Sequence, residues 1–487
     1  MSTELQTNEP GLPGLPGCRD GASGRRKMIL LEMPWGRDKD PRVPLGHASL
    51  LASLWEFGKG EIVSMVSPIN DSRTNPEKLN LEIMRIADSR TDVDLAIGAY
   101  VWAEDVLKRL LTLVRASGFS GRIILGGPQI SYTPDGLEEL YPEADVFVRG
   151  YGEMAIVALF NEPEIKEIQG VHFAGQEDLN EQTSVDLSFL PSPWLSGAID
   201  IAGQKFVRWE SQRGCVFRCS FCQHKEAGKR LERRELEEIR VMDEIDLFCR
   251  SGIEEIAVLD PIFNMSSMAN RILRRFVDKG FTGRLSLQCR AEKCDEEFLQ
   301  LASQLDVKLE FGLQTIHRHE GKAVNRVNNM RFVEKWLGRA KELGIDYEVS
   351  IIFGLPNQTL ESFKQTVDWC LRTGVPVIKA FPLMLLRGTE VEQRRFEWGL
   401  VESDDTMPVV IQSDTFSHQE WLDMFRLSEA LKVTEKSHPV DFQELMSISS
   451  RMSIKMDRFR PKTSTRIAVN MDLGKVKRGC PVQEARG

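Results

Sequence analysis

The stretch FVRWESQRGCVFRCSFCQH, residues 206–224, places three cysteines directly after a strand-like run. Cys215, Cys219 and Cys222 have the spacing C-x3-C-x2-C, so one short loop presents three thiolates. Thiolates are soft ligands that suit iron–sulfur clusters. A [4Fe–4S] cube has four irons, so three cysteines leave one iron open to an amine and a carboxylate, such as those of S-adenosylmethionine (SAM). The loop therefore predicts a [4Fe–4S] cluster that binds SAM.

A zinc knuckle is the alternative interpretation of the same cysteines, with His224 as a possible fourth ligand. Structural zinc usually takes its four ligands as two separated pairs, and the sequence has no second C-x2-C pair. The other cysteines are scattered along the chain: Cys18, Cys249, Cys289, Cys294, Cys370 and Cys480. Their positions do not predict a second cluster, and the sequence favours iron over zinc.

Composition excludes several classes of protein. The 487 residues are 41% hydrophobic and 28% charged, with a net charge of −9, so no broad basic face is predicted for nucleic acid. No apolar run reaches the roughly 18–20 residues of a membrane span. The first residues, MSTELQTNEPG, do not have the pattern of a secretory signal. Nine cysteines without that signal indicate a reducing compartment, and we expect a cytoplasmic location.

The N-terminal third shows alternating strand and helix patterns. Residues 1–26, rich in Gly and Pro, are expected to form a disordered leader. From 27 to 160, strand candidates such as KMILLEM and RIILGGPQ alternate with amphipathic helices such as EDVLKRLLTLVRAS. This alternation predicts a doubly wound parallel sheet, which binds ligands at the carboxyl ends of its strands.

A second alternating series begins near residue 205. Residues 161–204 look like a linker, and 205–390 contain six strand candidates separated by helices, from VRWESQ to VIKAFPLM. Six parallel strands with intervening helices predict a partial (β/α)6 barrel with its chemistry in the loops of the C-terminal face. Residues 391–487 are expected to form a small, mainly helical cap or tail. The predicted fold class is α/β.

The cysteine loop resembles the signature of the radical SAM superfamily, which has this spacing and an aromatic residue before the third cysteine, here Phe221. The resemblance implies that the cluster reduces the sulfonium of SAM to give a 5′-deoxyadenosyl radical. It also implies that the backbone around Phe221 contacts the adenine. In such systems the cofactor supplies the difficult chemistry and the protein supplies orientation.

Motifs along the barrel extend this resemblance to the subfamily that contains the anaerobic magnesium-protoporphyrin cyclase. EIAVLDPIF carries Asp260 of a "DD-x-F"-like element, although Pro261 replaces the second Asp. LEFGLQT, VNR and VSIIFGLPNQT resemble the elements that contact SAM in the family. The SAM-binding residues implied by the resemblance are Phe221, Glu310, Gln314, Arg326 and Gly354. Arg326 matches the arginine that pairs with the SAM carboxylate, a pairing that guanidinium geometry suits.

Residues 27–160 resemble the cobalamin-binding domain that precedes radical SAM barrels in this subfamily. The motifs that carry the resemblance are PLGHASLLASLWEFG, ILGGPQISYTP and ADVFVRGYGE, the last with GYGE in place of the usual GEGE. The cobalamin-binding residues that it implies are Gly126, Gly127, Pro128, Gly150, Gly152 and Glu153. No D-x-H-x-x-G element occurs, so a histidine ligand to cobalt is not predicted. A domain that keeps the fold and has lost cobalamin is the alternative.

These observations together lead to a functional hypothesis. We expect cobalamin-dependent C-methylation of a small-molecule biosynthetic intermediate, with an external electron donor of the flavodoxin or ferredoxin type. The alternative within the superfamily is a non-methylating dehydratase, deoxygenase, cyclase or oxidoreductase that acts on a polar substrate such as an aminosugar. A zinc-stabilised binding module is the non-catalytic alternative. The sequence assigns no catalytic side chain and does not identify the substrate.

Overall fold

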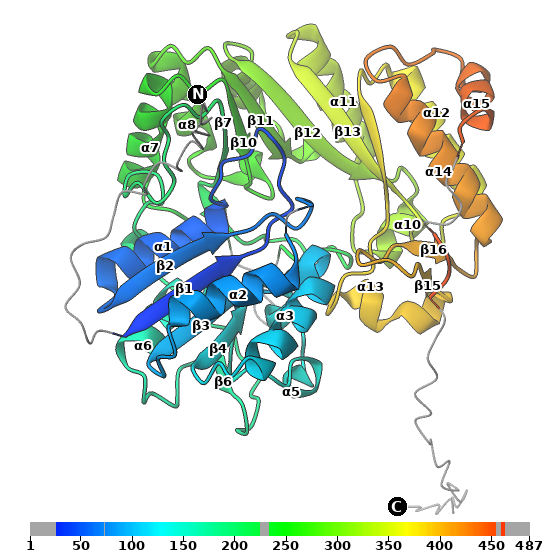
Figure 1. Cartoon of the computed structure of the whole chain (residues 1–487). Helices are drawn as coiled ribbons and strands as arrows, with labels where there is room; N and C mark the ends of the chain where they lie inside the picture. The colour runs from blue at the N-terminus through cyan, green and yellow to red at the C-terminus, as the bar shows by residue number, and fades with distance from the viewer. Residues whose placement is uncertain (1–25, 73, 225–232, 454–458, 463–487) are drawn as a thin grey trace, which may run out of the picture.

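Two parallel sheets organise the chain into an N-terminal unit and a barrel-like unit that lie against each other (Figure 1). The computed structural model describes residues 26–72, 74–224, 233–453 and 459–462. The expected leader therefore lies outside the described residues except for Arg26, and so does the end of the chain from residue 463. The predicted mixed α/β class is confirmed.

The N-terminal sheet has the strand order β2-β1-β3-β4-β5-β6. Its helices cover both faces, as a doubly wound sheet requires. One face packs on α1 and α6 and the other on α2 and α3. The bounds are β1 Lys27–Glu32, α1 Leu45–Phe57, β2 Glu61–Val66, α2 Pro76–Ala87, β3 Val93–Gly98, α3 Glu104–Ala116, β4 Arg122–Gly126, α4 Pro128–Ser131, α5 Leu137–Leu140, β5 Val146–Val148, α6 Glu153–Asn161 and β6 Val171–Phe173.

The central strands are apolar along their whole length because both of their faces are covered by helices. In β1, Met28 and Leu30 belong to the core under α1 and α6, whereas Ile29 and Leu31 belong to the core under α2 and α3. Burial of both faces explains why these strands read as continuous apolar runs rather than as alternating patterns. The order of strands changes direction between β1 and β3, and this switch point is where such sheets bind ligands.

Strand β6 was not expected. It lies inside the 161–204 stretch that looks like a linker, and it pairs antiparallel with β5 at the edge of the sheet. The N-terminal sheet is therefore parallel except for this edge strand. A three-residue strand carries too little alternation for sequence periodicity to reveal it.

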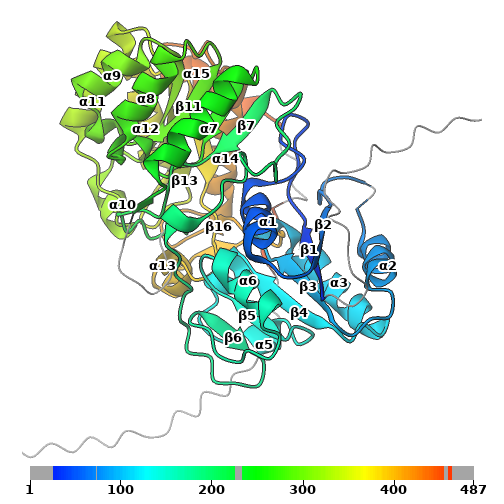
Figure 2. The same ribbon diagram turned by 90° about the vertical axis from the view of Figure 1, so that its left-hand side faces the viewer.

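The barrel-like unit has the strand order β7-β10-β11-β12-β13-β14, with all neighbours parallel. Within the described residues the two edge strands do not pair, so the barrel is open. Figure 2 shows its helices together on the outer side of the sheet. The bounds are β7 Phe206–Trp209, β8 Gln212–Arg213, β9 Arg234–Glu235, α7 Glu238–Arg250, β10 Glu255–Val258, α8 Ala269–Asp278, β11 Arg284–Cys289, α9 Glu296–Ala302, β12 Asp306–Gln314, α10 Arg318–Ala323, α11 Met330–Glu342, β13 Asp346–Phe353, α12 Leu360–Thr373 and β14 Ile378–Pro382.

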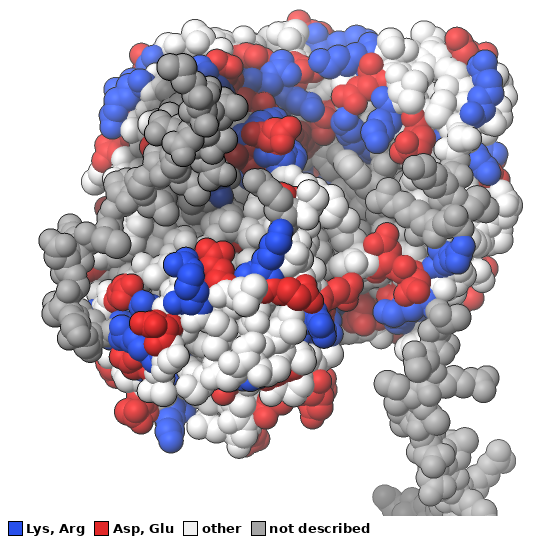
Figure 3. All heavy atoms as spheres, in the orientation of Figure 1, with Lys and Arg blue, Asp and Glu red and all other residues white. Residues whose placement is uncertain are grey.

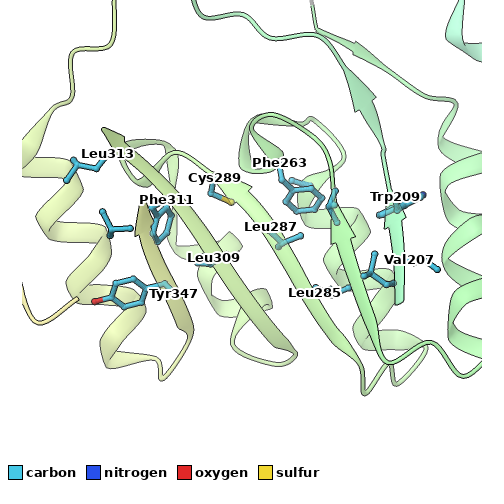
Figure 4. Close-up of a cluster of buried hydrophobic side chains, with 14 of the residues drawn as sticks. Val207, Trp209, Phe263, Leu285, Leu287, Cys289, Leu309, Phe311, Leu313 and Tyr347 are labelled. Atoms are coloured by element: carbon cyan, nitrogen blue, oxygen red, sulfur yellow. The ribbon is translucent and has the colours of Figure 1, made fainter. Parts of the chain in front are cut away.

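The helix-facing side of the barrel sheet forms its hydrophobic core (Figure 4). Trp209, Leu287 and Phe311, from three different strands, are almost completely buried there. Along β12, buried apolar residues such as Phe311 alternate with Lys308, Glu310 and other partly exposed side chains, which lie on the inner side of the sheet. The period of two therefore separates a packing face from a polar face that is available for chemistry.

The C-terminal segment packs on the β14 side of the barrel. It contains α13 Glu390–Gln393, β15 Val401–Glu402, β16 Val410–Gln412, α14 His418–Val433 and α15 Phe442–Ser450. The expected long helix is α14, and the short antiparallel pair β15–β16 adds strand to a region expected to be mainly helical. None of the described helices combines the length and apolar character needed to cross a membrane.

An ion triad around a buried carboxylate joins the amino ends of the neighbouring strands β1, β3 and β4. The Asp94 carboxylate is fully buried and accepts from the Arg26 guanidinium at 2.6 and 2.9 Å and from that of Arg122 at 2.8 and 3.0 Å. We expect Asp94→Ala to lower the free energy of unfolding by about 3 kcal/mol, because two guanidiniums lose their partner. Asp92→Ala is the control, because its exposed pair with Arg90 contributes about 0–1 kcal/mol. Equal urea midpoints for the two variants would contradict this expectation.

Candidate functional site

The cysteine loop leaves the barrel at the carboxyl end of β7, where such folds carry their chemistry. The antiparallel pair of β8 and β9 closes its base. Cys215, Cys219 and Cys222 are partly exposed and form no disulfide. Among the described residues, no three His, Cys, Asp or Glu side chains converge tightly enough to hold one metal ion. In a [4Fe–4S] cube each thiolate binds a different iron, so this cluster does not need such a convergence.

Ser220 anchors the middle of the loop to the barrel. Its backbone N–H donates to the Val324 carbonyl at 2.9 Å, and its carbonyl accepts from Val391 at 3.1 Å. Its hydroxyl donates to Glu390 at 3.0 Å and accepts from the Asn325 amide at 2.8 Å. Ser220 is fully buried, so these bonds are shielded from water. The segments at 324–325 and 390–391 therefore hold the second and third cysteines in place.

Gln223 joins the loop to two other parts of the chain. Its side-chain amide donates to the Arg387 carbonyl at 2.7 Å, and its own carbonyl accepts from the Tyr132 hydroxyl. Tyr132 belongs to the N-terminal unit, and Arg387 follows β14. Arg387 in turn pairs with Glu104 of α3 at 2.8 Å. The cysteine loop is thus connected to the N-terminal unit as well as to the barrel.

Two guanidiniums lie beside the cysteines. Burial raises the pKa of the Cys215 thiol, and the charges of Arg326 and Arg290 act in the opposite direction. Arg290 sits 4.0 Å over the ring of Phe217, within the loop. Burial and the neighbouring Arg290 both lower the pKa of Arg326. The site therefore carries positive charge where three thiolates are predicted.

The structure brings Arg326 and Gln314 together at the end of β12, and their role in binding SAM stays a prediction. Arg326 donates to the Gly312 carbonyl and has no partner for its buried Nε within the described residues. A methyl group placed on Gly312 would lie 2.8 Å from Gln314 Nε2 and 3.4 Å from Arg326 Nη2. The absence of a side chain at this position therefore leaves room for the two polar groups.

Glu310 lies further down the inner face of the same strand. Its neighbours there are charged: burial and Glu348 raise its pKa, and Lys308 opposes them. Glu310 therefore lies among charged side chains in the middle of the barrel rather than beside the cysteine loop. Its role in binding SAM stays a prediction.

Three further positions singled out from the sequence are structurally engaged. Asp260 is buried and accepts from the Ser211 and Gln212 N–H groups at 2.8 and 3.2 Å, which ties β10 to β7. Gly354 has φ +88° and donates to Gln358, and a methyl group there would lie 3.2 Å from the Val410 carbonyl. Phe221 is half-buried and packs on the barrel core.

A largely apolar cavity of about 310 Å³ lies at the carboxyl ends of β1, β3, β4 and β5. We call it the switch-point cavity, because it opens where the strand order reverses. Five of the six predicted cobalamin-binding residues line it: Gly126, Gly127, Gly150, Gly152 and Glu153. The sixth, Pro128, lines the neighbouring cavity described below.

Two glycines shape the wall of the switch-point cavity. Gly127 has φ +95° and Gly150 has φ +79°, and a methyl group on either would lie 2.9 Å from a backbone carbonyl, that of Ala99 or Thr183. Only glycine adopts these conformations without strain and allows such close approach. The resulting wall is thin and free of side chains, as a flat macrocycle requires.

Glu153 contributes to the cavity differently from the glycines. It is buried and accepts from Arg213 at 2.6 Å and from Ser49 at 2.9 Å. Burial alone would raise the pKa of Glu153, but the Arg213 guanidinium holds it below its usual value. Arg213 stands two residues before the first cysteine, so this ion pair joins the cavity wall to the cysteine loop.

A second cavity, of about 320 Å³, begins where the first ends, and we call it the inter-domain cavity. It shares Gly127, Gly150, Tyr151, Glu210, Arg213 and Leu259 with the switch-point cavity. It reaches the cysteine loop at Gly214, Gln223 and His224. The two cavities thus adjoin, and together they extend from the end of the N-terminal sheet to the cysteine loop.

Several residues that build this site were not found from the sequence. Ser220, Gln223, Asn325 and Glu390 are ordinary polar residues outside any predicted motif, and only their convergence reveals them. Arg213 precedes the cysteines, yet its partner Glu153 is 60 residues away. Lys225 and Lys229, which the sequence places beside the cluster, lie outside the described residues.

The fold and the site together define a two-unit α/β protein with a three-cysteine loop between an open parallel barrel and a doubly wound domain. Residues 209–370 match the model of the radical SAM superfamily. The barrel-like unit therefore contains a radical SAM domain over these residues.

Curated relatives agree with this assignment. The cobalamin-dependent radical SAM methyltransferase TokK of Streptomyces tokunonensis is 26% identical over 326 residues, which cover 61% of this chain and 48% of TokK. The 2-(S-pantetheinyl)-carbapenam-3-carboxylate methyltransferase of Streptantibioticus cattleyicolor is 25% identical over 395 residues, 72% of this chain and 58% of the relative. The chain thus spans about half the length of these relatives.

Solved structures share the fold. The radical SAM methyltransferase TsrM from Kitasatospora setae, bound to tryptophan and a SAM analogue, aligns with a TM-score of 0.61 at 17% identity over 80% of each chain. The cobalamin-dependent radical SAM enzyme OxsB, bound to aqua-cobalamin and SAM, aligns with a TM-score of 0.64 at 14% identity over 87% of this chain and 70% of OxsB. Both units of the chain therefore have counterparts in one fold.

The residues present fit the groups that this superfamily implies. A [4Fe–4S] cluster with one open iron requires three thiolates, which this loop supplies, and two guanidiniums offset their charge. The amino-acid end of SAM requires a partner for its carboxylate, and Arg326 is a buried guanidinium whose Nε has no partner within the described residues. The apolar, glycine-walled switch-point cavity is suited to a corrin.

One buried carboxyl group in the switch-point cavity makes stability depend on pH. Burial raises the pKa of Glu32 from 4.5 to about 7, although a hydrogen bond with Tyr100 partly opposes it. The folded protein thus keeps this proton while the unfolded chain releases it near pH 4.5. The stabilisation is complete below pH 4.5 and is lost as pH rises through 7. Between pH 4.5 and 8 we expect the wild type to lose about 3 kcal/mol more free energy of unfolding than Glu32→Gln. Parallel urea-denaturation curves for both proteins across this range would contradict the expectation.

Proposed function

We propose that the chain is a cobalamin-dependent radical SAM methyltransferase that methylates a carbon atom of a small molecule. The observation that carries this proposal is the pair of adjoining cavities that extends from the end of the N-terminal sheet to the cysteine loop. A methyl carrier and a radical source must both reach one substrate, and the inter-domain cavity lies between the places proposed for them. The names of the curated relatives support the same reaction class.

When bound, the cluster would supply one electron to SAM, and cobalamin would carry the methyl group. The chain's own residues bind and orient. Cys215, Cys219 and Cys222 would hold three irons, and Arg326 would pair with the SAM carboxylate, next to Gln314. The reducing electron would come from an external donor of the flavodoxin or ferredoxin type.

Anchoring of the loop has a chemical purpose in this proposal. The Ser220 and Gln223 hydrogen bonds fix the loop to the barrel and to the N-terminal unit. A reaction between groups held in different units depends on their distance, because misplacement of reacting groups by about 1 Å costs about a hundredfold in rate. The contacts between the units therefore support the proposed transfer.

Removal of one thiolate tests the cluster. In anaerobically reconstituted protein we expect about four irons and four sulfides per wild-type chain, and 5′-deoxyadenosine after addition of SAM and reductant. Cys219→Ala should lose most of the iron and all of the 5′-deoxyadenosine. Cys249→Ala, a change of the same type outside the loop, should retain both. Iron analysis and mass spectrometry measure the outcome, and a fully loaded wild type that never cleaves SAM would overturn the proposal.

Substitution of a cavity glycine tests the corrin site. Gly127→Ala would place a methyl group 2.9 Å from the Ala99 carbonyl and displace the cavity wall, so we expect cobalamin affinity to fall about tenfold or more. Gly118→Ala is the matched control, because Gly118 has a similar φ of +87° but nothing within 4 Å of the added methyl group. Absorbance titration with hydroxocobalamin reports binding without any need for turnover.

The corrin proposal would fail if wild-type protein retained no cobalamin. It would also fail if Gly127→Ala and Gly118→Ala bound cobalamin equally well.

A further inference from the structure

At the border between the two cavities, buried charge is unevenly balanced among the described residues. Arg213 lines both cavities and pairs with two carboxylates: Glu153, which lines the switch-point cavity, at 2.6 Å, and Glu210, which lines both cavities, at 2.7 Å. The side chains of Arg213, Glu153 and Glu210 are only 12%, 5% and 16% exposed, respectively. Two carboxylates and one guanidinium leave one negative charge in excess. In a partly desolvated site such an excess attracts a cation much more strongly than at the surface.

The geometry of Glu210 leaves part of its carboxylate available. Both of its hydrogen bonds from Arg213, at 2.7 and 3.0 Å, end on the same oxygen, Oε1. Arg213 also donates hydrogen bonds to Glu153 and Ser49. Glu210 lines the cavity, so its second oxygen can accept from a ligand.

Gln212 provides an independent sign that a hydrogen-bond donor belongs here. This residue is 2% exposed and lines the inter-domain cavity. Its amide nitrogen donates to the Ile262 carbonyl at 3.0 Å, which fixes the orientation of the amide group. Its Oε1 is then a buried acceptor without a partner among the described residues. An unpaired buried acceptor is costly, so a ligand that donates to it gains free energy on binding.

We propose that the inter-domain cavity recognises a substrate through a protonated primary amine. The N–H groups of the ammonium donate to Gln212 Oε1, and its charge offsets the excess carboxylate at Glu210. A carboxylate at the same position would be repelled by Glu210 and would leave Gln212 unpaired. A hydroxyl would satisfy Gln212 but would not balance the charge. This inference rests on the proposed function, since it names the chemical group that the reaction chamber selects.

Three matched probes test the selectivity: benzylamine, benzyl alcohol and benzoate differ only in the group presented to the cavity. We would measure their binding to the full chain, loaded with cluster and cob(III)alamin, by saturation-transfer NMR. The expected order is benzylamine, then benzyl alcohol, with benzoate showing no binding. Equal signals from all three probes, or strongest binding of benzoate, would overturn the inference.

Two variants assign the selectivity to the named residues. Glu210→Gln keeps the shape of the side chain and removes the charge, so the affinity for benzylamine should fall about fivefold or more while that for benzyl alcohol is unchanged. Gln212→Met should weaken binding of both probes. Glu254→Gln is the charge-matched control, because Glu254 pairs with Lys205 at the exposed surface, and it should bind benzylamine as the wild type does.

Unchanged benzylamine binding in Glu210→Gln would overturn the assignment. Assay of 5′-deoxyadenosine in the same samples separates this inference from the proposed function. A wild type that cleaves SAM without preferring the amine contradicts the inference alone. A wild type that prefers the amine but never cleaves SAM contradicts the proposed function alone.

Discussion

The ion pair between Arg213 and Glu153 is the contact on which the arrangement of the site depends. Glu153 begins α6 in the N-terminal unit, and Arg213 lies two residues before Cys215 in the barrel-like unit. Both side chains are buried, and a lost partner would leave an uncompensated charge between the units. The pair therefore fixes the position of the cysteine loop relative to the switch-point cavity. Tyr151 adds to it by packing its ring 5.4 Å from the Arg213 guanidinium.

The other contacts of the loop act in the same direction. Gln223 accepts from Tyr132 of the N-terminal unit and donates to the residue Arg387, which itself reaches Glu104 of α3. These contacts use segments from three parts of the chain that are far apart in sequence. On the face drawn in Figure 3, acidic and basic side chains are interspersed on both units.

The sequence predicted the parts of this protein that repeat a local pattern. Every expected strand of the two sheets forms, because apolar runs between helical segments identify buried strands. The cysteine spacing located the loop. Gly127 and Gly150 were singled out from motifs that resemble a cobalamin-binding domain, and their backbone conformations favour a glycine. The short strand β6 and the β15–β16 pair were missed, because they lie in segments without an apolar run or a helix–strand alternation.

The cysteine loop could be located from its spacing, but the residues that support it could not be found from the sequence. Nothing in the sequence distinguishes Ser220 from other serines. Only the structure shows its hydrogen bonds with Val324, Asn325 and Glu390. Glu153 was singled out as a cobalamin residue, yet its main partner is a guanidinium from the other unit. Long-range pairs of this kind depend on how the two sheets are placed, and a single sequence contains no local signal of that placement.

The two cavities differ in the way that a two-part reaction requires. The switch-point cavity is mostly apolar, and burial raises the pKa of the Glu32 carboxyl to about 7. The inter-domain cavity is lined by the ion pair of Arg213 and Glu210 and by Gln212, whose amide oxygen has no partner among the described residues. An apolar cavity suits a large cofactor whose binding depends on the burial of apolar surface. A few polar groups in fixed positions suit the orientation of a small substrate. Arg213 borders both cavities, so the residue that aligns the cysteine loop also lies between the cavity proposed for the cofactor and the cavity proposed for the substrate.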